Sequence, residues 1–483
     1  MIITEDKYLG LAVDWHLRID GNLGILYYYD PEGMIFHHLS LEKVTALLLM
    51  NGQNRLSEVR EILSYLLDYL SESEVKKTIE SIFTAASDDK NPTCILNVSD
   101  TPTISHNYDL ESFIKKINNA KEGDNFSLIK RRLAAPLNLT IMPSNVCVTD
   151  CIYCYAERKQ IPQNELMSTE RWLELIDEAH SLGVELAVFS GGDPLTSPAI
   201  LPILKRAIDK RFLFILPTKT FISKKLAGQM AEIGMQKSWN QISLDGILPQ
   251  TLKQMVGIDD YDQIAFQSIK NLLEAGLKVR INIVITPLNY LEVPALTRKL
   301  CEMGVIRIGY TGYGRTHYRH NDDLFLTDNQ IQFINEQTEL LKNEFKGTKI
   351  NNSTGTRDFS KMTIEERSQT WKGRSKCSGG RSSIAISPNG DVTLCEQMPL
   401  EKEYVVGNLK NQSIAEIWNS ERMWNMINVP MEKFRGTPCD QCEQFVECQE
   451  VYGHCFRDAL FNFGTIYTPP PACPKAPVGL RMK

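Results

Sequence analysis

The stretch "SNVCVTDCIYCYAERK", residues 144–159, contains three closely spaced cysteines, Cys147, Cys151 and Cys154. A tetrahedral zinc site takes four ligands, often as two pairs, but the next histidine after these thiols is His180. A four-iron cubane held by three thiolates would leave its fourth iron open to a small molecule. The spacing therefore favours an open iron–sulfur cluster over a chance grouping or a zinc loop with a distant fourth ligand.

Seven more cysteines lie in the last quarter of the chain: Cys377, Cys395, Cys439, Cys442, Cys448, Cys455 and Cys473. The C-x2-C pair within this group is typical of half a zinc ribbon, but seven thiols are too many for one zinc ion. We expect His454 to lie behind the ligands or on the surface rather than to bind metal. Cys94 and Cys301 stand alone.

Composition limits the remaining possibilities. The chain has 483 residues, of which 42% are hydrophobic, and this length predicts two to four domains. Its net charge of −6 makes a nucleic-acid partner unexpected. The N-terminus lacks the pattern of a signal peptide, and no apolar run approaches the length of a membrane span. We therefore expect a cytoplasmic protein with no membrane partner, in which cysteines serve metal or redox chemistry.

The elements around the first cysteines alternate along the chain. "APLNLTIMP" predicts a short strand that leads into the cysteine loop, and a helix is expected to begin at an N-cap at Ser168 or Thr169. Apolar strands and amphipathic helices then follow in turn as far as "IRIGYTG". This order predicts a parallel sheet with right-handed crossovers. About six such units are present, which is too few for a full eight-fold barrel.

"CVTDCIYCY" resembles the signature of the radical S-adenosylmethionine (SAM) enzymes, which have an aromatic residue, here Tyr153, just before the third cysteine. The resemblance implies an α/β fold with a partial (β/α)6 barrel, expected at residues 136–345. It also implies that the open iron chelates the amino and carboxylate groups of SAM. An electron from the cluster then cleaves SAM to methionine and a 5′-deoxyadenosyl radical, which abstracts hydrogen from the substrate.

The same resemblance implies which residues contact SAM. "SGGDP" after the second expected strand matches the family's glycine-glycine-acid-proline motif, in which the backbone and the acid receive the SAM amino group. "ISLDG" lies where the family places polar contacts to the ribose. The expected cofactor-binding residues are Tyr153, Gly191, Gly192, Asp193 and Ser243.

One expected SAM contact has no obvious residue in this chain. Relatives often carry an arginine that reaches the SAM carboxylate, but the corresponding region here reads "LKQMVG". Lys253 and Arg280 are the candidate replacements. Asp245 is interpreted equally well as the start of a turn with Gly246.

The C-terminal cysteines resemble the SPASM domain, which carries two auxiliary iron–sulfur clusters. The likeness includes two strands around a Pro-Asn-Gly turn and a helix capped near Ser413. We expect this domain at residues 375–483, after a bridging segment at 346–374. The resemblance implies one cluster on Cys377, Cys395 and Cys455, and another on Cys439, Cys442, Cys448 and Cys473. Together with the SAM-binding cluster, this makes three [4Fe–4S] clusters.

Two full cubanes need about eight thiolates, whereas this region supplies seven. "QTWKGRSK", just before Cys377, contains no cysteine. The cluster on Cys377 is therefore expected to have an open iron, or to take Cys94 or a non-cysteine ligand. An open iron near the radical site could bind a substrate thiolate.

Residues 1–90 are expected to form three strands ("WHLRID", "GILYYYD", "GMIFHHL") followed by three helices. This order resembles the winged-helix-like, PqqD-like peptide-recognition domain of ribosomal-peptide biosynthesis, which binds a precursor's leader as an added β-strand. A DNA-binding winged helix is disfavoured by the acidic "SESE" and by the overall charge. Residues 91–135 are expected to be a linker with one helix, "DLESFIKKINNA".

Taken together, these resemblances imply a radical SAM peptide maturase that forms thioether crosslinks, as sactipeptide and ranthipeptide maturases do. The expected partners are a ribosomal precursor peptide, bound through its leader, and a flavodoxin- or ferredoxin-type electron donor. Three alternatives remain open. They are a carbon–carbon crosslinking maturase, an oxidase resembling anaerobic sulfatase maturases, and a zinc-binding peptide scaffold without enzyme activity.

Overall fold

The computed structural model describes residues 3–12, 15–20, 23–30, 33–86, 95–103, 132–157, 161–355, 359–374 and 376–477. The chain divides into two compact units, unit 1 (Met1–Leu128) and unit 2 (Ile129–Lys483). Cys94 and the helix expected at residues 109–120 lie outside the described residues. Within the described residues, no helix is both long and apolar enough to span a membrane.

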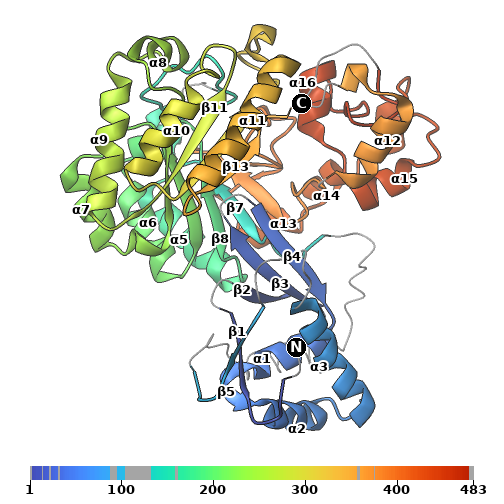
Figure 1. The fold of residues 1–483 in the computed structure, drawn as a ribbon. Coiled ribbons are helices and arrows are strands. Elements are labelled where there is room, and N and C mark those ends of the chain that lie inside the picture. The colour runs from blue at the N-terminus through green and yellow to red at the C-terminus, as the bar shows by residue number, and fades with distance from the viewer. Residues whose placement is uncertain are drawn as a thin grey trace. The chain divides into compact units, whose positions relative to one another are not determined.

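The described residues of unit 1 form two small antiparallel sheets and three helices (Figure 1). One sheet has the order β5-β1-β6 and the other the order β2-β3-β4. The elements are β1 (Tyr8–Leu11), β2 (Trp15–Asp20), β3 (Leu23–Asp30), β4 (Gly33–Leu39), α1 (Leu41–Leu49), β5 (Asn51–Arg55), α2 (Leu56–Leu66), α3 (Glu72–Ala86) and β6 (Leu96–Ser99).

Apolar periodicity accounts for most of unit 1. Its helices bury Val44, Val59 and Ile79 against Leu9 and Trp15 in one core. Three strands, β1, β5 and β6, were not expected from the sequence. β5 has the polar sequence "NGQNR" and is a strand because it pairs with β1. β6 lies inside the segment interpreted as a linker, and it pairs with the other edge of β1.

Unit 2 alternates strands and helices and then continues into the C-terminal cysteine-rich part. Its strands are β7 (Asn138–Ile141), β8 (Leu186–Phe189), β9 (Leu213–Thr218), β10 (Trp239–Ser243), β11 (Lys278–Ile285), β12 (Arg307–Gly312), β13 (Lys349–Ser353), β14 (Ser383–Ile386), β15 (Asp391–Thr393) and β16 (Gly407–Asn408). Its helices are α5 (Thr169–Ser181), α6 (Ile200–Asp209), α7 (Lys224–Glu232), α8 (Pro249–Val256), α9 (Tyr261–Glu274), α10 (Val293–Glu302), α11 (Asp328–Glu344), α12 (Ile364–Gly373), α13 (Ile414–Trp418), α14 (Glu421–Ile427), α15 (Phe445–Glu447) and α16 (Phe456–Phe463).

These strands form one sheet in the order β13-β12-β11-β10-β9-β8-β7-β14-β15-β16. Pairing is parallel from β13 through β7 to β14 and antiparallel only in β14-β15-β16. The expected alternation of strands and helices in a parallel sheet is present. Its parallel run extends beyond six strands because β13 comes from the segment interpreted as a bridge. β14, from the expected C-terminal domain, pairs with β7 rather than starting a separate sheet.

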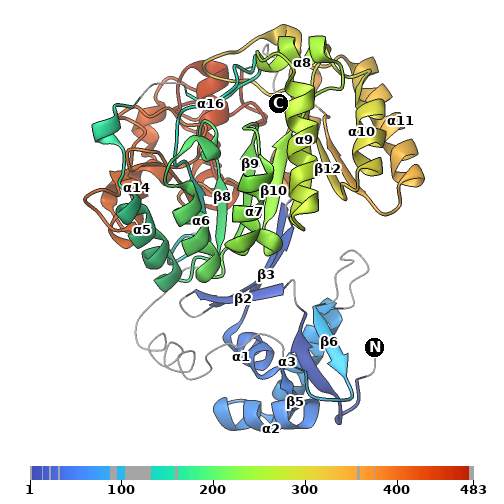
Figure 2. The same cartoon turned by 90° about the vertical axis from the view of Figure 1, so that its left-hand side faces the viewer.

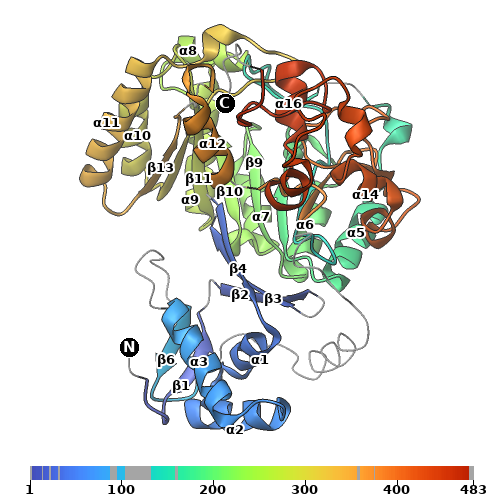
Figure 3. The same cartoon turned by 90° about the vertical axis from the view of Figure 1, so that its right-hand side faces the viewer.

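Helices pack on the sheet as the crossovers require. Figure 2 shows α6, α7 and α9 alongside β8, β9 and β10, and Figure 3 shows α12, α14 and α16 among the orange and red C-terminal elements. Ser168 caps α5 by accepting a hydrogen bond from the Arg171 N–H at 3.1 Å. Ser413 likewise caps α13. Both capping residues agree with the sequence patterns.

Candidate cluster and cofactor site

The loop between β7 and α5 carries the first cysteine set, Cys147, Cys151 and Cys154. The Thr149 hydroxyl lies 3.3 Å from the Sγ atom of Cys147 and 3.3 Å from that of Cys151. It therefore holds two of the three thiols on one side of the loop. Because β7 is parallel to its neighbours, the loop lies at the carboxyl edge of the sheet, where α/β folds bind cofactors.

The cysteine loop is also fixed from α8, a helix that was not predicted. The N–H groups of Asp150 and Ile152 donate to the carbonyls of Val256 and Met255, at 2.8 and 3.0 Å. These carbonyls belong to the last turn of α8, where intrahelical partners are missing. The end of α8 and the cysteine loop therefore supply hydrogen-bond partners for each other's backbone groups.

The two glycines after β8 have a steric reason to be glycine. A Cβ atom on Gly191 would lie 2.3 Å from the Ser144 carbonyl oxygen, and one on Gly192 would lie 2.1 Å from that of Val146. Gly191 also has φ +108°, which side chains disfavour. The Gly192 N–H donates to Ser144 at 2.9 Å. Both predicted glycines therefore lie directly against the start of the cysteine loop.

Asp193 is buried, and its carboxylate is occupied by the protein. It accepts hydrogen bonds from the Thr218 hydroxyl at 2.8 Å and from the N–H groups of Leu195, Lys219 and Thr220 at 3.0, 2.7 and 3.0 Å. A carboxylate has about four acceptor positions, so these contacts saturate it. The geometry favours a positioning role, joining the loops after β8 and β9, over the expected direct contact with an amino group.

Tyr153 bonds to a residue that follows β10, and Ser243 is the last residue of that strand. The Tyr153 hydroxyl donates to Asp245, which follows β10. The Ser243 carbonyl, at the end of β10, accepts a hydrogen bond from the Tyr261 hydroxyl at 2.7 Å. The Ser243 side chain is half-buried at the carboxyl edge of the sheet. Its contact with a ribose remains a prediction.

Asp245 is more than a turn residue. Its side chain is fully buried, and its second oxygen accepts from the Val284 N–H at 2.8 Å. The Asn289 side-chain amide donates to its backbone carbonyl. A short "DG" pair after a strand looks like a turn, so the sequence pattern alone did not identify this buried anion beside the cysteine loop.

The cations near the loop also differ from expectation. Lys253 is 61% exposed and pairs with Asp259 at 2.7 Å, so it does not face the site. Arg280 lies near the beginning of β11, away from the carboxyl edge. Lys219, directly after β9, is instead the lysine beside Asp245, with Nζ 4.0 Å from the carboxylate. Its place after a strand of the parallel sheet was the available sequence signal.

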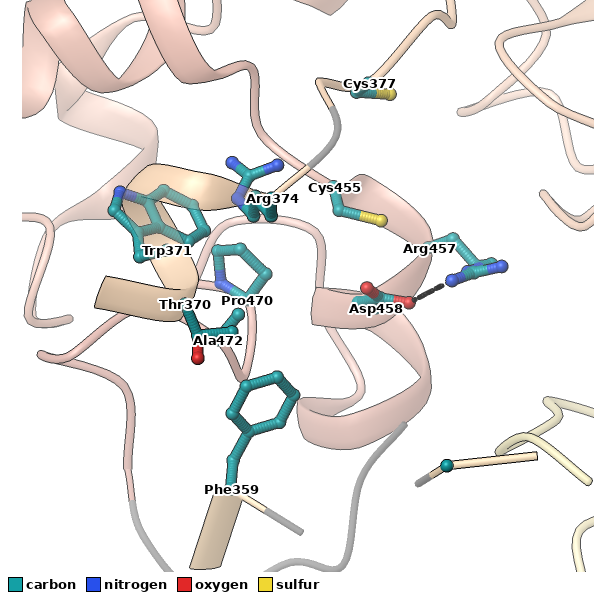
Figure 4. A pocket seen from close by; sticks show the side chains of 11 residues that line it. Phe359, Thr370, Trp371, Arg374, Cys377, Cys455, Arg457, Asp458, Pro470 and Ala472 are labelled. Atoms are coloured by element: carbon teal, nitrogen blue, oxygen red, sulfur yellow. Dashed lines mark hydrogen bonds and ion pairs between the residues drawn. The ribbon is translucent and has the colours of Figure 1, made fainter. Parts of the chain in front are cut away.

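The second cysteine set consists of Cys377, Cys395 and Cys455. Two of its members, Cys377 and Cys455, line a cavity of about 360 Å³ (Figure 4). Burial, with a smaller contribution from the neighbouring Cys377 thiol, raises the pKa of Cys395 to about 11. Burial also raises the pKa of Cys455 well above its usual value, with a further rise from Cys377. Cys377 and Cys455 therefore lie at one cavity, and a cluster shared by these two cysteines with Cys395 remains a prediction.

Charged and aromatic side chains complete the wall of this cavity. The Arg374 guanidinium lies 3.7 Å from the centroid of the Trp371 ring. Arg457 donates to Asp458 at 2.6 Å, and Figure 4 shows this ion pair close to Cys455. The cavity volume falls in the range of small-ligand and cofactor sites. His454 is buried and faces the Ile466 carbonyl at 3.0 Å, so it is not a surface residue.

The third cysteine set consists of Cys439, Cys442, Cys448 and Cys473. Burial, with smaller contributions from the other three thiols, raises the pKa of Cys439 to about 12. The Lys475 ammonium lies 3.2 Å from the Cys442 sulfur. Arg367 is buried and donates to the Pro471, Cys473 and Ala476 carbonyls at 3.0, 2.7 and 3.1 Å. This arginine fixes the segment that carries Cys473.

Within the described residues, no three His, Cys, Asp or Glu side chains group closely enough to bind a single metal ion. A four-iron cluster places each thiolate on a different iron, so its ligands need not meet at one point. The three sets provide buried or half-buried sulfur donors, which suit iron–sulfur clusters. Cys301 lies apart on α10, where Thr348 and Glu344 are its neighbours.

Two family models match the chain. The radical SAM superfamily matches residues 141–313, and the iron–sulfur cluster-binding domain SPASM matches residues 377–448. The second match ends at Cys448, so Cys455 and Cys473 lie beyond it.

Curated proteins with two different names align with this chain. Fe-coproporphyrin III synthase from Methanosarcina barkeri is 26% identical over 344 residues, which cover 68% of this chain and 85% of that protein. PqqA peptide cyclase from Granulibacter bethesdensis is 22% identical over 356 residues, which cover 71% of this chain and 88% of that protein.

Among solved structures, Streptococcus suis SuiB bound to S-adenosylmethionine aligns with a TM-score of 0.67 and 18% identity, over 96% of this chain and 99% of that chain. SuiB bound to its precursor peptide SuiA aligns with a TM-score of 0.65 and 17% identity over the same shares. At these identities the likeness concerns the fold. The domain matches imply SAM and iron–sulfur clusters as cofactors. The chain therefore carries a radical SAM domain followed by a SPASM iron–sulfur cluster-binding domain.

Proposed function

We propose that this chain is a radical SAM peptide maturase that installs thioether crosslinks in a ribosomally made precursor peptide. The observation that carries the peptide part is the fold match to SuiB, which covers 96% of this chain and therefore includes most of unit 1. A second solved SuiB structure contains a precursor peptide. A curated relative named a peptide cyclase, with 22% identity, supports the same substrate class.

In this proposal, different residues of the chain have different roles. The first cysteine set would hold the SAM-binding cluster, and Gly191 and Gly192 keep its loop against β8. Asp193 and Asp245 fix the neighbouring loops. The bound cofactors would supply a 5′-deoxyadenosyl radical that removes hydrogen from carbon and a cluster that accepts one electron. Closing the carbon–sulfur bond then releases one proton from the thiol and one electron.

The thioether part of the proposal rests on the second cysteine set. Two four-iron clusters have about eight ligand positions, whereas the C-terminal region has seven cysteines. The third set contains four of these cysteines, which leaves three for the second set. The cavity beside Cys377 and Cys455 gives a substrate thiol a place to approach. A thiolate is a natural ligand for an iron without a cysteine. Cys94 lies outside the described residues and is the competing ligand.

Unit 1 is proposed to bind the leader of the precursor. Among the described residues, β2 and β4 are the outer strands of one sheet, and β5 and β6 are those of the other. An outer strand presents N–H and C=O groups that an extended peptide can pair with. Electrons for the clusters would come from a flavodoxin- or ferredoxin-type donor.

The decisive experiment combines the anaerobically reconstituted enzyme with the precursor encoded beside its gene, followed by mass spectrometry. A thioether removes two hydrogens from the peptide and protects one cysteine from alkylation. A carbon–carbon crosslink removes two hydrogens and leaves every cysteine open to alkylation. An unmodified peptide, despite SAM cleavage, would contradict the peptide-maturase proposal.

A second experiment tests the open iron directly. A cysteine-containing precursor is expected to change the electron paramagnetic resonance spectrum of the cluster on Cys377, and its serine analogue is not. Cys94→Ala should leave iron content and turnover unchanged. Equal spectra with both peptides, or loss of iron on changing Cys94, would show that the protein completes this cluster itself.

A porphyrin-modifying activity is the second candidate function, because a curated relative with 26% identity is named Fe-coproporphyrin III synthase. Its match covers 68% of the chain, and that share cannot contain all of both units. We therefore expect no iron-coproporphyrin III to form when the enzyme is incubated with SAM, reductant and iron-containing tetrapyrrole precursors. Formation of iron-coproporphyrin III would replace the peptide proposal.

A further inference from the structure

Three arginines lie around the second cysteine set. Arg374 and Arg457 line the same cavity as two of its cysteines, Cys377 and Cys455, and Figure 4 shows these four side chains. The third arginine, Arg381, is buried, with 8% of its surface exposed. Burying a cation is costly unless negative charge lies nearby. The thiolates that would hold a cluster here are one source of such charge.

Arg374 and Arg381 both lie against Gly453. The Arg374 guanidinium donates a hydrogen bond to the Gly453 carbonyl. A Cβ atom on Gly453 would lie 3.8 Å from the Arg381 Nε atom and 3.4 Å from the Cys377 Cβ atom. Arg381 also donates to the Gln449 carbonyl at 2.5 Å. Burial raises the pKa of Cys377, and the charges of Arg381 and Arg374 oppose this rise. The backbone therefore holds both arginines close enough to act on this thiol.

Arg457 lies beside the other two members of the set. It follows Cys455 by two residues and donates to the side chain of Gln397, two residues after Cys395, at 3.1 Å. It also donates to the neighbouring Asp458 at 2.6 Å, so this carboxylate offsets part of its positive charge. Burial raises the pKa of Cys455, and the charge of Arg457 opposes this rise.

The third cysteine set has a different balance of charge. It contains four cysteines, one more than the second set. Arg367 donates to the carbonyl of Cys473, and the Lys475 ammonium lies 3.2 Å from the sulfur of Cys442. Lys475 is exposed, so water and salt screen its charge. Because the potential of an iron–sulfur cluster depends on its net charge and on its surroundings, the two clusters should differ in potential.

We propose that Arg374 and Arg381 raise the reduction potential of the cluster on the second cysteine set above that of the cluster on the third set. A positive charge nearby stabilises the negative charge that reduction adds to a cluster. When the product bond closes, its one released electron would reduce the second-set cluster, and the proton would pass to solvent. This inference rests on the proposed function for its two auxiliary clusters. It holds for a thioether and for a carbon–carbon crosslink, since closing either bond releases one electron and one proton.

The test is a redox titration of the full-length, anaerobically reconstituted protein, followed by electron paramagnetic resonance. The first cysteine set is replaced by alanine, so that only the two auxiliary clusters contribute, and Cys439→Ser identifies the transition of the third set. Arg374→Gln and Arg381→Gln remove a charge but keep an amide donor. Each should make reduction of the second-set cluster about tenfold less favourable, which is about 59 mV for one electron. Arg374→Lys keeps the charge and should shift the potential less.

Two further variants separate charge from a loosened fold. Lys372→Gln removes a positive charge two residues before Arg374, at an exposed position where water and salt screen it. This control should leave both potentials unchanged. Asp458→Asn removes the negative charge beside Arg457, so the second-set potential should rise. A shift of opposite sign would not come from a general weakening of the domain.

Iron content is measured for every variant. With about eight irons bound, unchanged potentials in both glutamine variants would overturn the inference and leave the proposed clusters intact. A second-set potential below that of the third set, or an equal shift of both, would also overturn it. About four irons in the background protein would instead contradict the second-set cluster itself, and with it that part of the proposed function. If the glutamine variants lose iron, Asp458→Asn decides, and the absence of a rise there would overturn the inference.

Discussion

The Tyr153 hydroxyl, from the cysteine loop, donates a hydrogen bond to the carboxylate of Asp245, which follows β10. Asp245 has no exposed side-chain surface. The contact joins the loop of the first cysteine set to the opposite part of the sheet edge. A residue expected to contact SAM therefore also has a partner within the protein.

Tyr153→Phe removes this hydroxyl and leaves a buried carboxylate oxygen with one partner fewer. We expect a destabilisation of about 1–3 kcal/mol, measured as a lower melting temperature of the reconstituted protein. Tyr65→Phe is the matched control, because Tyr65 is 84% exposed. Equal melting temperatures for the two variants would show that the bond contributes nothing.

Replacing Cys147, Cys151 and Cys154 together by alanine should lower the iron content from about twelve to about eight atoms per chain. SAM cleavage by dithionite-reduced protein should stop, because this set lies at the carboxyl edge of the parallel sheet. Iron analysis and 5′-deoxyadenosine assays check both effects. Continued formation of 5′-deoxyadenosine would contradict the assignment of the cysteine loop.

Gly192→Ala should displace the cysteine loop, because its Cβ would lie 2.1 Å from the Val146 carbonyl oxygen. We expect fewer iron atoms on the first set and weaker SAM binding. Gly228→Ala is the control. Gly228 lies in α7 with no atom within 4 Å of its Cβ position, so alanine should stabilise the protein by about 0.5–1 kcal/mol. Full iron content in Gly192→Ala would show that the loop adapts.

Arg367→Met leaves three carbonyls around Cys473 without their donor. Each buried acceptor left unpaired costs about 1–3 kcal/mol, so the segment should detach and up to about four irons should be lost. Lys372→Met, at an exposed position of the same helix, should retain all iron. Iron analysis together with thermal unfolding distinguishes the two variants. Normal iron content in Arg367→Met would separate Cys473 from the third set.

Deleting residues 1–128 should greatly weaken binding of the full precursor while leaving SAM cleavage nearly intact. The cut follows the boundary between the units rather than residue 90, because β6 pairs with β1 and belongs to unit 1. Precursor binding is measured by fluorescence anisotropy with a labelled peptide. A truncated chain with undiminished affinity would show that the leader binds elsewhere.

Helices and strands were predictable where apolar residues recur along the chain with the period of a helix or a strand. Strands such as β9 and β11 and helices such as α6 and α10 show this periodicity directly. β5 and β6 were missed because their strand character comes from pairing with β1, which is distant in sequence. The roles of Asp245 and Lys219 also depend on neighbours from other strands, so no local sequence pattern predicts these roles.

The pairing of β14 with β7 limits which parts of this protein can be exchanged or can unfold separately. β7 precedes the first cysteine set, and β14 lies between Cys377 and Cys395, so one continuous ladder of backbone hydrogen bonds joins the two metal-binding regions. The C-terminal part is consequently not an interchangeable module. Exchanging it at residue 375 for an unrelated domain would leave β7 as an unpaired edge, open to association with other chains. Both regions should instead open together and exchange their amide hydrogens as one cooperative block.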